Sequence, residues 1–389
     1  MRQHNFDEEI DRRGTGCKKW EQYPADILPL WVADTDYKVP QEIIDTLAAK
    51  VEHGIFGYTG LTGGSFEKAT ARWLKQHFGW EIDTSLVEYT PSIGSALAFA
   101  VQSFSVPGDN VVIQTPIYPP FRQSVEVNGR KAVENALIRK GDTWLIDFED
   151  LEKKLAAPRT RLFLLCNPHN PTGRCFTRDE LKRISELCLK YNVIVFSDEI
   201  HSDFIYCKHG MISFPTISKE AAQQCLVTIN PSKTFNIADF RTASVVSDNR
   251  YLLDRYRATM QGTRIGRQSM GITAYVTAYT QCDYYKDQVA AYIGKNMEYA
   301  VKYFNERIPG IHAYAPEATY LLWLDCGKLG MKQPELEKFF LEQAKVAFNS
   351  GTEFGAQGEG FMRMNLGCTM KTLKEALARI ERAVTSLKK

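Results

Sequence analysis

Short apolar runs of strand length alternate with amphipathic helical patterns between residues 65 and 250, and this alternation constrains the fold more than any other feature. Continuous apolar runs occur at 161–166 (RLFLLC), 193–196 (VIVF) and 226–229 (LVTI). Runs of this kind are typical of strands that helices cover on both faces. The pattern therefore predicts an α/β protein whose large domain contains a mainly parallel sheet covered by helices.

Further elements of the large domain follow from the same periodicities. Strands are expected at 111–114 and 242–246, and helices at 65–78 and after residue 177. Residues 177–180 (TRDE) have the pattern of a capping box, which marks the start of a helix. Helical periodicity places the apolar residues that follow on one face: Leu181, Ile184, Leu187, Cys188 and Tyr191.

The pattern changes after about residue 285, where we predict a smaller α+β domain. Helices are expected near 286–307, near 333–346 and from about 371, with strands at 320–324 and 361–366. Residues 1–45 contain no clear element of the large domain and are expected to pack with the small one. We therefore divide the chain into an N-terminal segment (1–45), a large cofactor-binding domain (46–284) and a small C-terminal domain (285–389).

The composition argues against several classes of function. The chain has 48 Lys plus Arg against 46 Asp plus Glu, so its net charge of +2 provides no basic field for nucleic acid. No apolar run approaches the roughly 20 residues that a bilayer span needs. The N-terminus is charged from the start and lacks the apolar core of a signal peptide. We expect a soluble, cytoplasmic protein that binds neither nucleic acid nor membranes.

The nine cysteines show no pattern of paired ligands. They stand far apart along the chain, without a C-x-x-C pair. A disulfide framework or a structural zinc site would need tighter, paired spacing. Cys166 and Cys188 fall inside apolar runs and are expected to be core residues. The spacing therefore predicts neither a metal site nor a catalytic cysteine.

Three loops that are rich in reactive groups follow three of the predicted strands. They are NPHNPTGR at 167–174, SDEIH at 197–201 and NPSKT at 230–234. Read singly, the first could be only a turn, Asp198 only a helix N-cap and Lys233 only a surface lysine. In doubly wound sheets, however, the loops beyond the carboxyl ends of the strands gather at one edge. We therefore expect the three loops to converge on one site.

The combined chemistry of the three loops suits a pyridoxal phosphate site. A partly desolvated lysine such as Lys233 has a lowered pKa and can bond covalently to an aldehyde. A buried carboxylate such as Asp198 can hold a pyridinium nitrogen protonated, which makes the ring an electron sink. The side chain of Asn170 can donate a hydrogen bond to a phenolic oxygen on the same ring.

The order and spacing of these residues resemble those of fold-type I pyridoxal-phosphate enzymes of the class I/II aminotransferase superfamily. Asn170 precedes Pro-Thr-Gly, Asp198 follows 28 residues later, Lys233 follows after 35 more, and Arg241 lies eight past the lysine. Five segments are similar in particular to the MalY/PatB cystathionine β-lyase branch, a group of C–S lyases. These segments are LWVAD at 30–34, FGY at 56–58, TPIYPPF at 115–121, SDEIH at 197–201 and SKTFN at 232–236.

The resemblance implies an aspartate aminotransferase-like fold with pyridoxal 5'-phosphate as the cofactor. Lys233 would carry the cofactor and then move the Cα proton of the substrate. Asp198 would pair with the pyridine nitrogen, Asn170 would bond the ring oxygen, and Tyr118 would stack on the ring face. His201 would support the ring oxygen from behind, although a purely structural histidine is an alternative.

The resemblance also implies a phosphate site where residues 90–96 turn into a helix. The backbone N–H groups of Ile93 and Gly94 would hold the phosphate dianion, although an ordinary helix start is the alternative interpretation. Ser232 would add a hydroxyl and Arg241 a fixed positive charge. Asn230 would complete the group of cofactor-binding residues.

Three residues depart from the pattern that relatives often show around the phosphate. Asn230 stands where Ser, Thr or Ala is common, and Asp239 adds a negative charge where many relatives have Gly. Ser92 replaces a common Gly. We expect these departures to change details of the phosphate site and not the identity of the cofactor.

The substrate side of the site is implied by residues outside the three loops. Arg363, on a strand-like segment of the small domain, would bind the α-carboxylate of an amino acid, although a structural salt bridge is the alternative. Ala33 would add a backbone N–H, and Asn170 would also contact the substrate. Tyr58 would reach the phosphate from a neighbouring subunit, so the resemblance implies a homodimer with its active sites at the interface.

Two enzymatic functions and one non-enzymatic function remain open at this point. The first is β-elimination from cystathionine or another S-substituted cysteine, which yields pyruvate, ammonia and a thiol. The second is an aminotransferase, which would use the same residues. The third is a regulator that acts through protein contacts, but such a role would not require Lys233, Asp198, Asn170 and Arg363. A nicotinamide dehydrogenase is disfavoured because no G-x-G-x-x-G follows an early strand.

Overall fold

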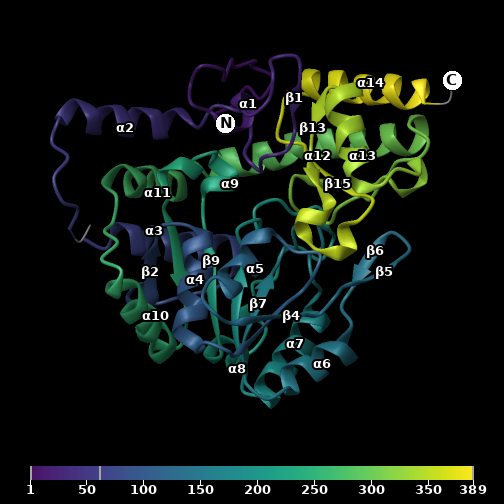
Figure 1. Cartoon of the computed structure of the whole chain (residues 1–389). Helices are drawn as coiled ribbons and strands as arrows, with labels where there is room; N and C mark the ends of the chain where they lie inside the picture. Colours follow the sequence, from purple (N-terminus) through teal and green to yellow (C-terminus); the bar gives the residue numbers. More distant parts are fainter. Residues whose placement is uncertain (1, 61–62, 388–389) are drawn as a thin grey trace.

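A seven-stranded sheet forms the centre of the large domain, the lower part of the molecule in Figure 1. The computed structural model describes residues 2–60 and 63–387. The strand order is β2-β10-β9-β8-β7-β3-β4. In chain order the strands are β2 (Val87–Thr90), β3 (Asn110–Ile113), β4 (Lys131–Glu134), β7 (Thr160–Cys166), β8 (Ile194–Asp198), β9 (Cys225–Ile229) and β10 (Ala243–Val246).

Most neighbouring strands of this sheet run parallel. The pairs β4–β3, β3–β7, β7–β8 and β8–β9 are parallel, whereas β10 runs antiparallel to both β9 and β2. The predicted strands at 161–166, 193–196 and 226–229 correspond to β7, β8 and β9 within two residues at each end. The prediction of an α/β fold with a mainly parallel sheet is confirmed.

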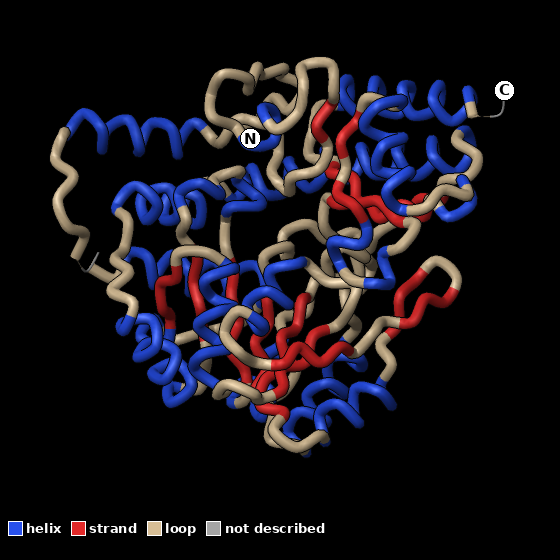
Figure 2. Tube along the Cα trace, viewed as in Figure 1, coloured by secondary structure: helices blue, strands red, loops and turns tan. Residues whose placement is uncertain are grey.

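Helices cover both faces of the sheet, as Figures 1 and 2 show. Along β7, Leu162 and Leu164 pack in a cluster with α4, α5 and α10, whereas Phe163 and Leu165 pack in another with α3, α6, α7 and α11. Such two-sided burial explains why the strand is a continuous apolar run. The helices are α3 (Ser65–Phe78), α4 (Ile93–Phe104), α5 (Pro119–Glu126), α6 (Phe148–Ala156), α7 (Arg178–Lys190), α8 (Lys219–Gln223), α9 (Ser232–Phe235), α10 (Arg250–Gly262) and α11 (Ser269–Gln281).

The capping box predicted at 177–180 is present at the start of α7. The Thr177 side chain accepts from the backbone N–H of Glu180, and the Glu180 carboxylate accepts from the backbone N–H of Thr177. Four residues of the predicted apolar face are buried in the helix, namely Leu181, Ile184, Leu187 and Cys188. The fifth, Tyr191, lies at the C-cap of the helix.

The small domain, at the upper right of Figure 1, combines an antiparallel sheet with helices. The sheet order is β11-β12-β15-β14, formed by β11 (His312–Ala313), β12 (Leu321–Asp325), β15 (Phe361–Asn365) and β14 (Asn349–Ser350). The helices are α12 (Asp283–Arg307), α13 (Gln333–Lys338) and α14 (Met370–Ser386). A hairpin of the large domain, β5 (Ile138–Lys140) and β6 (Thr143–Leu145), lies below this domain.

The helix expected near 333–346 is present but ends early, at Gln343, and changes type within its length. The helix α13 ends at Lys338, a π-helix at Phe339–Gln343 continues it, and Lys345 has a left-handed φ of 54°. This backbone turn directs the chain into β13 (Val346–Ala347), whose residues are buried. Pairing with another strand therefore outweighs the helical pattern of the sequence.

The N-terminal segment contacts both domains. It contains α1 (Lys18–Glu21) and β1 (Leu28–Pro29), and β1 pairs in parallel with β13. The next helix, α2 (Gln41–His53), packs on α11 and runs through the boundary that we predicted between residues 45 and 46. The helix α12 begins at Asp283, two residues before the other predicted boundary. The division at 1–45, 46–284 and 285–389 stays a prediction.

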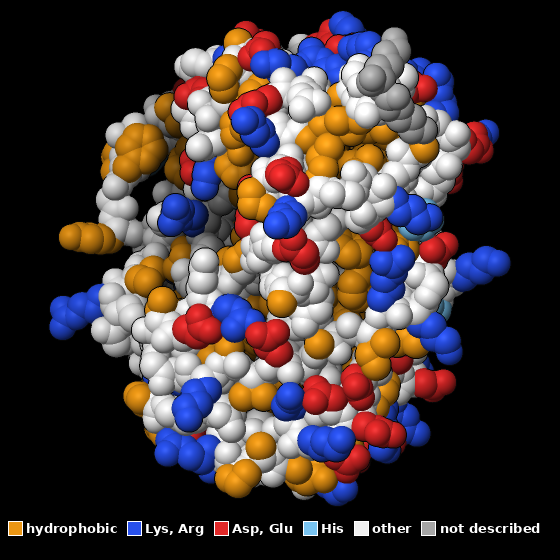
Figure 3. Space-filling view, turned by 45° about the vertical axis from the view of Figure 1, so that its right-hand side comes forward, with side chains coloured by type: hydrophobic (Ala, Val, Ile, Leu, Met, Phe, Trp, Pro, Cys, Tyr) orange, Lys and Arg blue, Asp and Glu red, His pale blue; other side chains and the backbone are white. Residues whose placement is uncertain are grey.

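Charges of both signs are mixed over the face of the molecule that Figure 3 shows. This distribution agrees with the small net charge of the chain. None of the helices within residues 2–60 and 63–387 has the length and the apolar character that a bilayer span requires.

Candidate active site

The three predicted loops meet at a cavity of about 360 Å³ at the carboxyl edge of the large sheet. The loops follow β7, β8 and β9, and the start of α4 and the N-terminal segment complete the wall. Eleven of the thirteen residues that we predicted for the site line this cavity: Ala33, Ile93, Gly94, Tyr118, Asn170, Asp198, His201, Asn230, Ser232, Lys233 and Arg241. The other two predicted residues do not line the cavity. Arg363 donates a hydrogen bond to the lining residue Asn170, whereas Tyr58 lies elsewhere.

Lys233 lies on the short helix α9, directly after β9. Its Nζ donates a hydrogen bond of 2.6 Å to the backbone carbonyl of Ala33. Burial and the Arg363 cation lower the pKa of Lys233, Asp34 and Asp198 act in the opposite direction, and the resulting pKa is about 8. Roughly a tenth of this amine is therefore uncharged at pH 7, and the uncharged form is the one that a nucleophile and proton acceptor requires.

Asp198 is the last residue of β8 and is almost fully buried. Its Oδ1 accepts a hydrogen bond of 3.1 Å from the backbone N–H of Ile200. Within the described part of the chain, no Lys, Arg or His forms an ion pair with it. Burial raises the pKa of Asp198 to about 7. A buried carboxylate without an ion-pair partner among these residues suits a ligand that brings a positive charge.

Arg363 lies on β15 and is almost fully buried. Its Nη1 donates to Asn170 Oδ1 at 3.0 Å, and its Nη2 donates to Asn349 Oδ1 at 2.6 Å and to the Trp31 carbonyl at 3.1 Å. The guanidinium carbon stands 4.8 Å from the ring centre of Phe354.

The Arg363 guanidinium has no carboxylate partner among residues 2–60 and 63–387, and its Nε has no hydrogen-bond partner there. Burial lowers the pKa of Arg363 to about 10. The structural salt bridge that we considered as an alternative is not formed by the described residues. A buried guanidinium of this kind needs an anion, and a carboxylate matches its planar geometry.

His201 is buried beside the cavity. Its Nδ1 has no partner in the part of the chain that the structure describes, and its ring lies 5.8 Å from that of Tyr320 at 73°. Burial lowers the pKa of His201 well below its ordinary range, and the cations of Lys233 and Arg363 act in the same direction. His201 is therefore a neutral imidazole with one nitrogen available for a ligand.

Tyr118 precedes α5 and lines the same cavity. Its backbone N–H donates to the Asn170 carbonyl at 3.2 Å. Tyr118 is 38% exposed, so its aromatic ring can contact a planar ligand in the cavity.

The start of α4 offers unused backbone donors. The Ser92 side chain caps the helix by accepting from the backbone N–H of Ser95 at 3.2 Å. The N–H groups of Ile93 and Gly94 precede this bond and lie in the first turn, where no carbonyl of the helix can reach them. Together with the helix dipole, these groups form a site for an anion.

Residues 230–241 supply further groups that line the cavity. Asn230 Oδ1 accepts from the backbone N–H of Ser232 at 2.7 Å, which fixes the turn into α9. Arg241 has a left-handed φ of 44°, and its exposed guanidinium forms no ion pair with the described residues. Asp239, the residue that departs from the family pattern, is also exposed. The Arg241 cation is therefore available to a phosphate.

A segment at 31–37 crosses the site, and sequence reasoning assigned only Ala33 to it. The Ala33 carbonyl accepts from Lys233 and, at 3.0 Å, from the hydroxyl of Tyr320. Asn236 donates to the carbonyls of Thr35 at 2.8 Å and of residue 37 at 3.1 Å. Asn365 donates to the carbonyls of residues 32 and 34. Side chains from both domains thus hold this segment against the lysine.

A buried ion cluster lies behind the same segment. The fully buried Lys19 contacts Asp36 at 2.9 Å, and Arg12 contacts Asp36 at 2.7 Å and Asp34 at 2.9 Å. Burial would raise the pKa of Asp34, but Lys19 and Arg12 lower it below its ordinary value. Asp34 is therefore charged, and its field favours the protonated form of Lys233.

Comparison with known proteins identifies the family of the chain. The family model described as "Aminotransferase class I and II" matches residues 25–380. The chain is 39% identical to cystathionine β-lyase PatB of Bacillus subtilis (strain 168), over 98% of this chain and 100% of PatB. It is 33% identical to protein MalY of Escherichia coli (strain K12), over 99% of this chain and 100% of MalY.

The structure is similar to the crystal structure of cystalysin from Treponema denticola, which contains a pyridoxal 5'-phosphate cofactor. The TM-score is 0.96 and the sequences are 32% identical, over 99% of this chain and 100% of cystalysin. The resemblance inferred from the sequence motifs is thereby confirmed at the level of the family. The chain belongs to the class I and II aminotransferase family.

Proposed function

We propose that the protein is a pyridoxal 5'-phosphate-dependent carbon–sulfur lyase that acts on cystathionine or another S-substituted cysteine. The observation that carries the proposal is a single cavity lined by a lysine of lowered pKa and a buried carboxylate, beside a buried guanidinium that donates to the lining residue Asn170. Neither the carboxylate nor the guanidinium has an ion-pair partner among the described residues. These groups are Lys233, Asp198 and Arg363. The identity to PatB over nearly the whole chain supports elimination in preference to amino transfer.

The polar groups at the cavity match the groups of the proposed cofactor one by one. Asp198 offers a carboxylate for the ring nitrogen, and Asn170 and the neutral His201 lie where they can support a ring oxygen. The start of α4 and the unpaired Arg241 offer donors for the phosphate. Lys233 supplies the amine that bonds covalently to the aldehyde.

We assign each proposed step of the reaction to a residue that lines the cavity or contacts a lining residue. When bound, the cofactor supplies an electron sink for the pair that remains when the substrate loses its Cα proton. Arg363 binds the α-carboxylate and so holds the amino acid in one orientation. Lys233 Nζ then accepts the Cα proton, because its pKa of about 8 leaves part of the amine uncharged near pH 7.

Carbon–sulfur cleavage requires the electron pair of that bond to leave with sulfur. The proton that Lys233 Nζ has accepted can then be given to the departing thiolate, which leaves as a thiol. Hydrolysis of the remaining three-carbon fragment yields pyruvate and ammonia. The protein must align the carbon–sulfur bond so that it can break. The bond between Arg363 and the α-carboxylate fixes one end of the substrate for that alignment.

The decisive experiment compares two reactions of the same purified enzyme. L-Cystathionine or an S-alkyl cysteine should give pyruvate, ammonia and a free thiol without any added keto acid. Alanine or an aromatic amino acid, each with 2-oxoglutarate, provides the comparison. Lys233→Ala serves as the matched control for reactions outside the cavity. Rapid amino transfer without release of pyruvate and thiol would contradict the lyase function and favour an aminotransferase.

We also propose that the protein acts as a homodimer in the cytoplasm. Tyr58 is fully exposed and lies after the end of α2. The chain leaves α2 at the left edge of the molecule in Figure 1. Val51, Ile55 and Phe56 nearby are exposed as well, and contiguous exposed apolar groups favour an interface. All nine cysteines lie among the described residues and are free thiols, which supports a reducing compartment.

The dimer can be tested independently of the reaction. Sedimentation should give twice the mass of the chain, and Tyr58→Ala should weaken cofactor binding without lowering that mass. A monomer with full cofactor affinity would contradict the proposed contribution of Tyr58 from a second subunit.

A further inference from the structure

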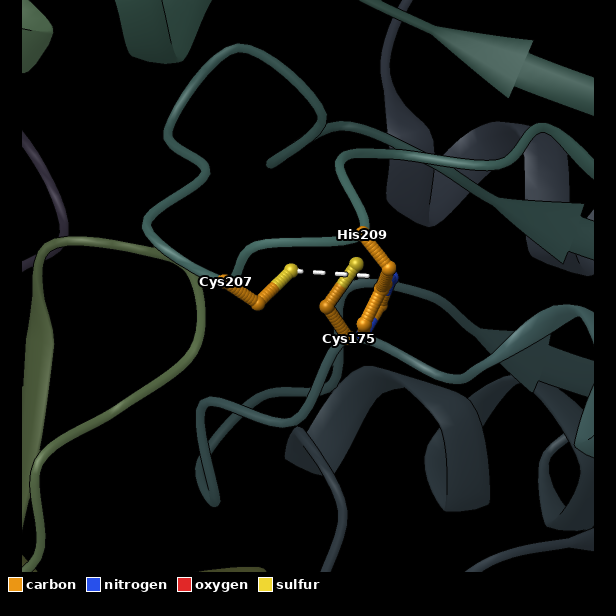
Figure 4. A group of neighbouring side chains, drawn as sticks. All are labelled: Cys175, Cys207 and His209. Atoms are coloured by element: carbon orange, nitrogen blue, oxygen red, sulfur yellow. Dashed lines mark hydrogen bonds between the residues drawn. The ribbon is translucent and has the colours of Figure 1, made fainter.

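Two thiols and an imidazole meet at the surface where the loops after β7 and β8 pack on the small domain. Cys175 follows the loop that carries Asn170, whereas Cys207 and His209 belong to the loop after β8 (Figure 4). The two Sγ atoms and a ring nitrogen all lie within 4.8 Å of one another. Cys207 Sγ and His209 Nδ1 are 3.7 Å apart.

A tight turn brings Cys207 and His209 together. The backbone N–H of Gly210 donates to the Cys207 carbonyl at 3.3 Å, and Gly210 has a left-handed φ of 71°. This conformation favours glycine and directs the Gly210 carbonyl into the cluster. Cys175 Sγ lies 3.7 Å from that oxygen, Cys207 Sγ 3.8 Å and His209 Nδ1 2.9 Å. Three side chains from two loops therefore face one point beside a carbonyl oxygen.

These separations are close to those of ligands around a tetrahedral zinc ion. Bonds of about 2.3 Å to sulfur and about 2.0–2.2 Å to nitrogen or oxygen place the ligand atoms about 3.4–3.8 Å apart. Three of the four measured separations are 3.7 or 3.8 Å. The 2.9 Å separation of His209 Nδ1 from the Gly210 oxygen needs an increase of only a few tenths of an ångström, on an exposed side chain.

We propose that Cys175, Cys207 and His209 form a binding site for a thiophilic divalent cation of the Zn²⁺ class. The Gly210 carbonyl, or a water held by it, is the fourth ligand. Binding releases the two thiol protons to water, so that two thiolates balance the charge of the ion. The imidazole binds through Nδ1 as a neutral ring: the proton that Nδ1 donates to the Gly210 carbonyl without metal is lost to water, and Nε2 takes one up from water. No oxidant or other reactant is required.

The cluster is accessible from solvent. Cys175 is buried, Cys207 is half-buried and His209 is exposed, so an ion can enter from the side of His209. Thiolates in such a partly buried place need a cation for their stability.

The backbone around the cluster is firmly held by the small domain. Glu317 Oε2 accepts from the backbone N–H of Cys175 at 2.9 Å and from Arg174 Nε at 2.8 Å. The Glu317 carbonyl accepts from the backbone N–H groups of Tyr206 and Cys207 at 2.8 and 3.0 Å. Both loops are thus tied to one residue, which keeps the ligands in position before binding. A bound ion would add a cross-link between the two loops.

The spacing of the cysteines could not indicate this site. Cys175 and Cys207 are separated by 31 residues and come from different loops, so no C-x-x-C pair marks them. The site also differs from the proposed lyase function, because none of its three ligands lines the cavity of the active site. Metal binding can therefore be measured without reference to turnover.

The test measures uptake of Zn²⁺ by the reduced holoenzyme. Equilibrium dialysis against zinc chloride, followed by elemental analysis, should show one equivalent of Zn²⁺ per chain. Cys207→Ser should lower the affinity at least about 100-fold, because even a residue that only supports a metal ligand changes affinity 10- to 100-fold. His209→Ala, at an exposed position, should lower it in the same way. Zn²⁺ should raise the Tm of the wild type and not that of either variant.

Matched controls are Cys17→Ser and His53→Ala, which remove a thiol and an exposed imidazole elsewhere and should keep the site intact. Circular dichroism of each variant reports whether it folds. Uptake well below one equivalent, or equal affinity in wild type and both ligand variants, would overturn the proposal. A Cys175–Cys207 disulfide that forms in the presence of Zn²⁺ and excludes the ion would also overturn it, because the pair would then be a redox couple.

Discussion

Arg363 Nη1 donates a hydrogen bond of 3.0 Å to Asn170 Oδ1, and this bond joins the small domain to the large one. Arg363 comes from β15, whereas Asn170 comes from the loop after β7, 193 residues earlier. The group that we propose for the substrate carboxylate therefore contacts the group that we propose for the ring of the cofactor. A change at either residue should affect the binding of both ligands.

Lys233→Ala should abolish covalent attachment of the cofactor and lower turnover by several orders of magnitude. No other lysine lines the cavity within the described residues, so no second amine can replace it. Borohydride reduction of the wild-type holoenzyme, followed by peptide mapping, should place the pyridoxyl label on Lys233. The exposed Lys182→Ala provides the control, and a label on any other lysine would disprove the assignment.

Asp198→Asn should lower turnover strongly while cofactor still binds. A neutral amide cannot stabilise a positive charge on the ring nitrogen, and each 1.4 kcal/mol of lost stabilisation costs about tenfold in rate. The measurement is kcat at full cofactor occupancy, which the visible absorbance band reports. Near-normal turnover at full occupancy would show that Asp198 does not contact the ring nitrogen.

Asp198→Asn should also change how the stability of the cofactor-free protein depends on pH. The pKa of Asp198 is about 7 when folded, well above that of an exposed aspartate. Between about pH 4 and pH 7 the unfolded chain releases this proton and the folded chain retains it, so stability falls as pH rises. Asp198→Asn removes this loss.

Denaturant unfolding of the cofactor-free proteins should therefore show a gain in stability from Asp198→Asn that grows between about pH 4 and pH 7. The gain should be on the order of a few kcal/mol at the upper end. Asp239→Asn, at an exposed carboxylate of the same edge, is the matched control. A gain that does not depend on pH would mean that Asp198 is ionised without cost in the folded protein.

Arg363→Lys should raise KM for the amino acid by at least about tenfold, because an ammonium group lacks the planar fork that matches a carboxylate. The lysine ammonium group also cannot donate to Asn170 and Asn349 at the same time, as the two Nη atoms of Arg363 do. The absorbance band of the bound cofactor should persist, which separates loss of substrate affinity from loss of cofactor. Arg382→Lys, on the surface of α14, should leave KM unchanged. An unaltered KM in Arg363→Lys would place the carboxylate elsewhere.

Tyr320→Phe tests whether the segment at 31–37 positions the lysine. The variant loses a buried hydrogen bond to the Ala33 carbonyl, which is about 1 kcal/mol of stabilisation, and leaves the Lys233 bond to the same oxygen in place. We expect kcat to fall about five- to tenfold and its pH profile to shift, since the Ala33 carbonyl that accepts from Lys233 would be held by one hydrogen bond fewer. Tyr314→Phe, a buried tyrosine away from the cavity, should change neither quantity.

The convergence of the three loops could be predicted from the sequence because a parallel sheet places the carboxyl ends of its strands at one edge. Asn170, Asp198 and Lys233 each follow a continuous apolar run, so their position in the fold was determined once those runs were identified as strands. The direction of β10 was not accessible in this way. Its composition is that of a buried strand in either direction.

Other parts of the site depend on contacts that leave no local signal. Tyr320 and Asn349 meet the site only because β12 and β14 flank β15, and neither stands in a recognisable motif. The helix α11 was missed because it is apolar on most sides, with Ile272, Tyr275 and Tyr279 all buried. A helix without a polar face shows no amphipathic period.

The antiparallel course of β10 has a consequence for how the site can vary. The loops after β7 and β8 lead away to helices, so added residues can be accommodated far from Asn170 and Asp198. Residues 230–242, in contrast, leave the sheet at Ile229 and return at Ala243 in the neighbouring strand, at the same edge. This loop is anchored at both ends, and it carries Lys233 and Arg241 between the anchors. An insertion between the anchors would shift Lys233 and Arg241 relative to each other at the cavity, so the length of this loop should tolerate far less change than that of the other two loops.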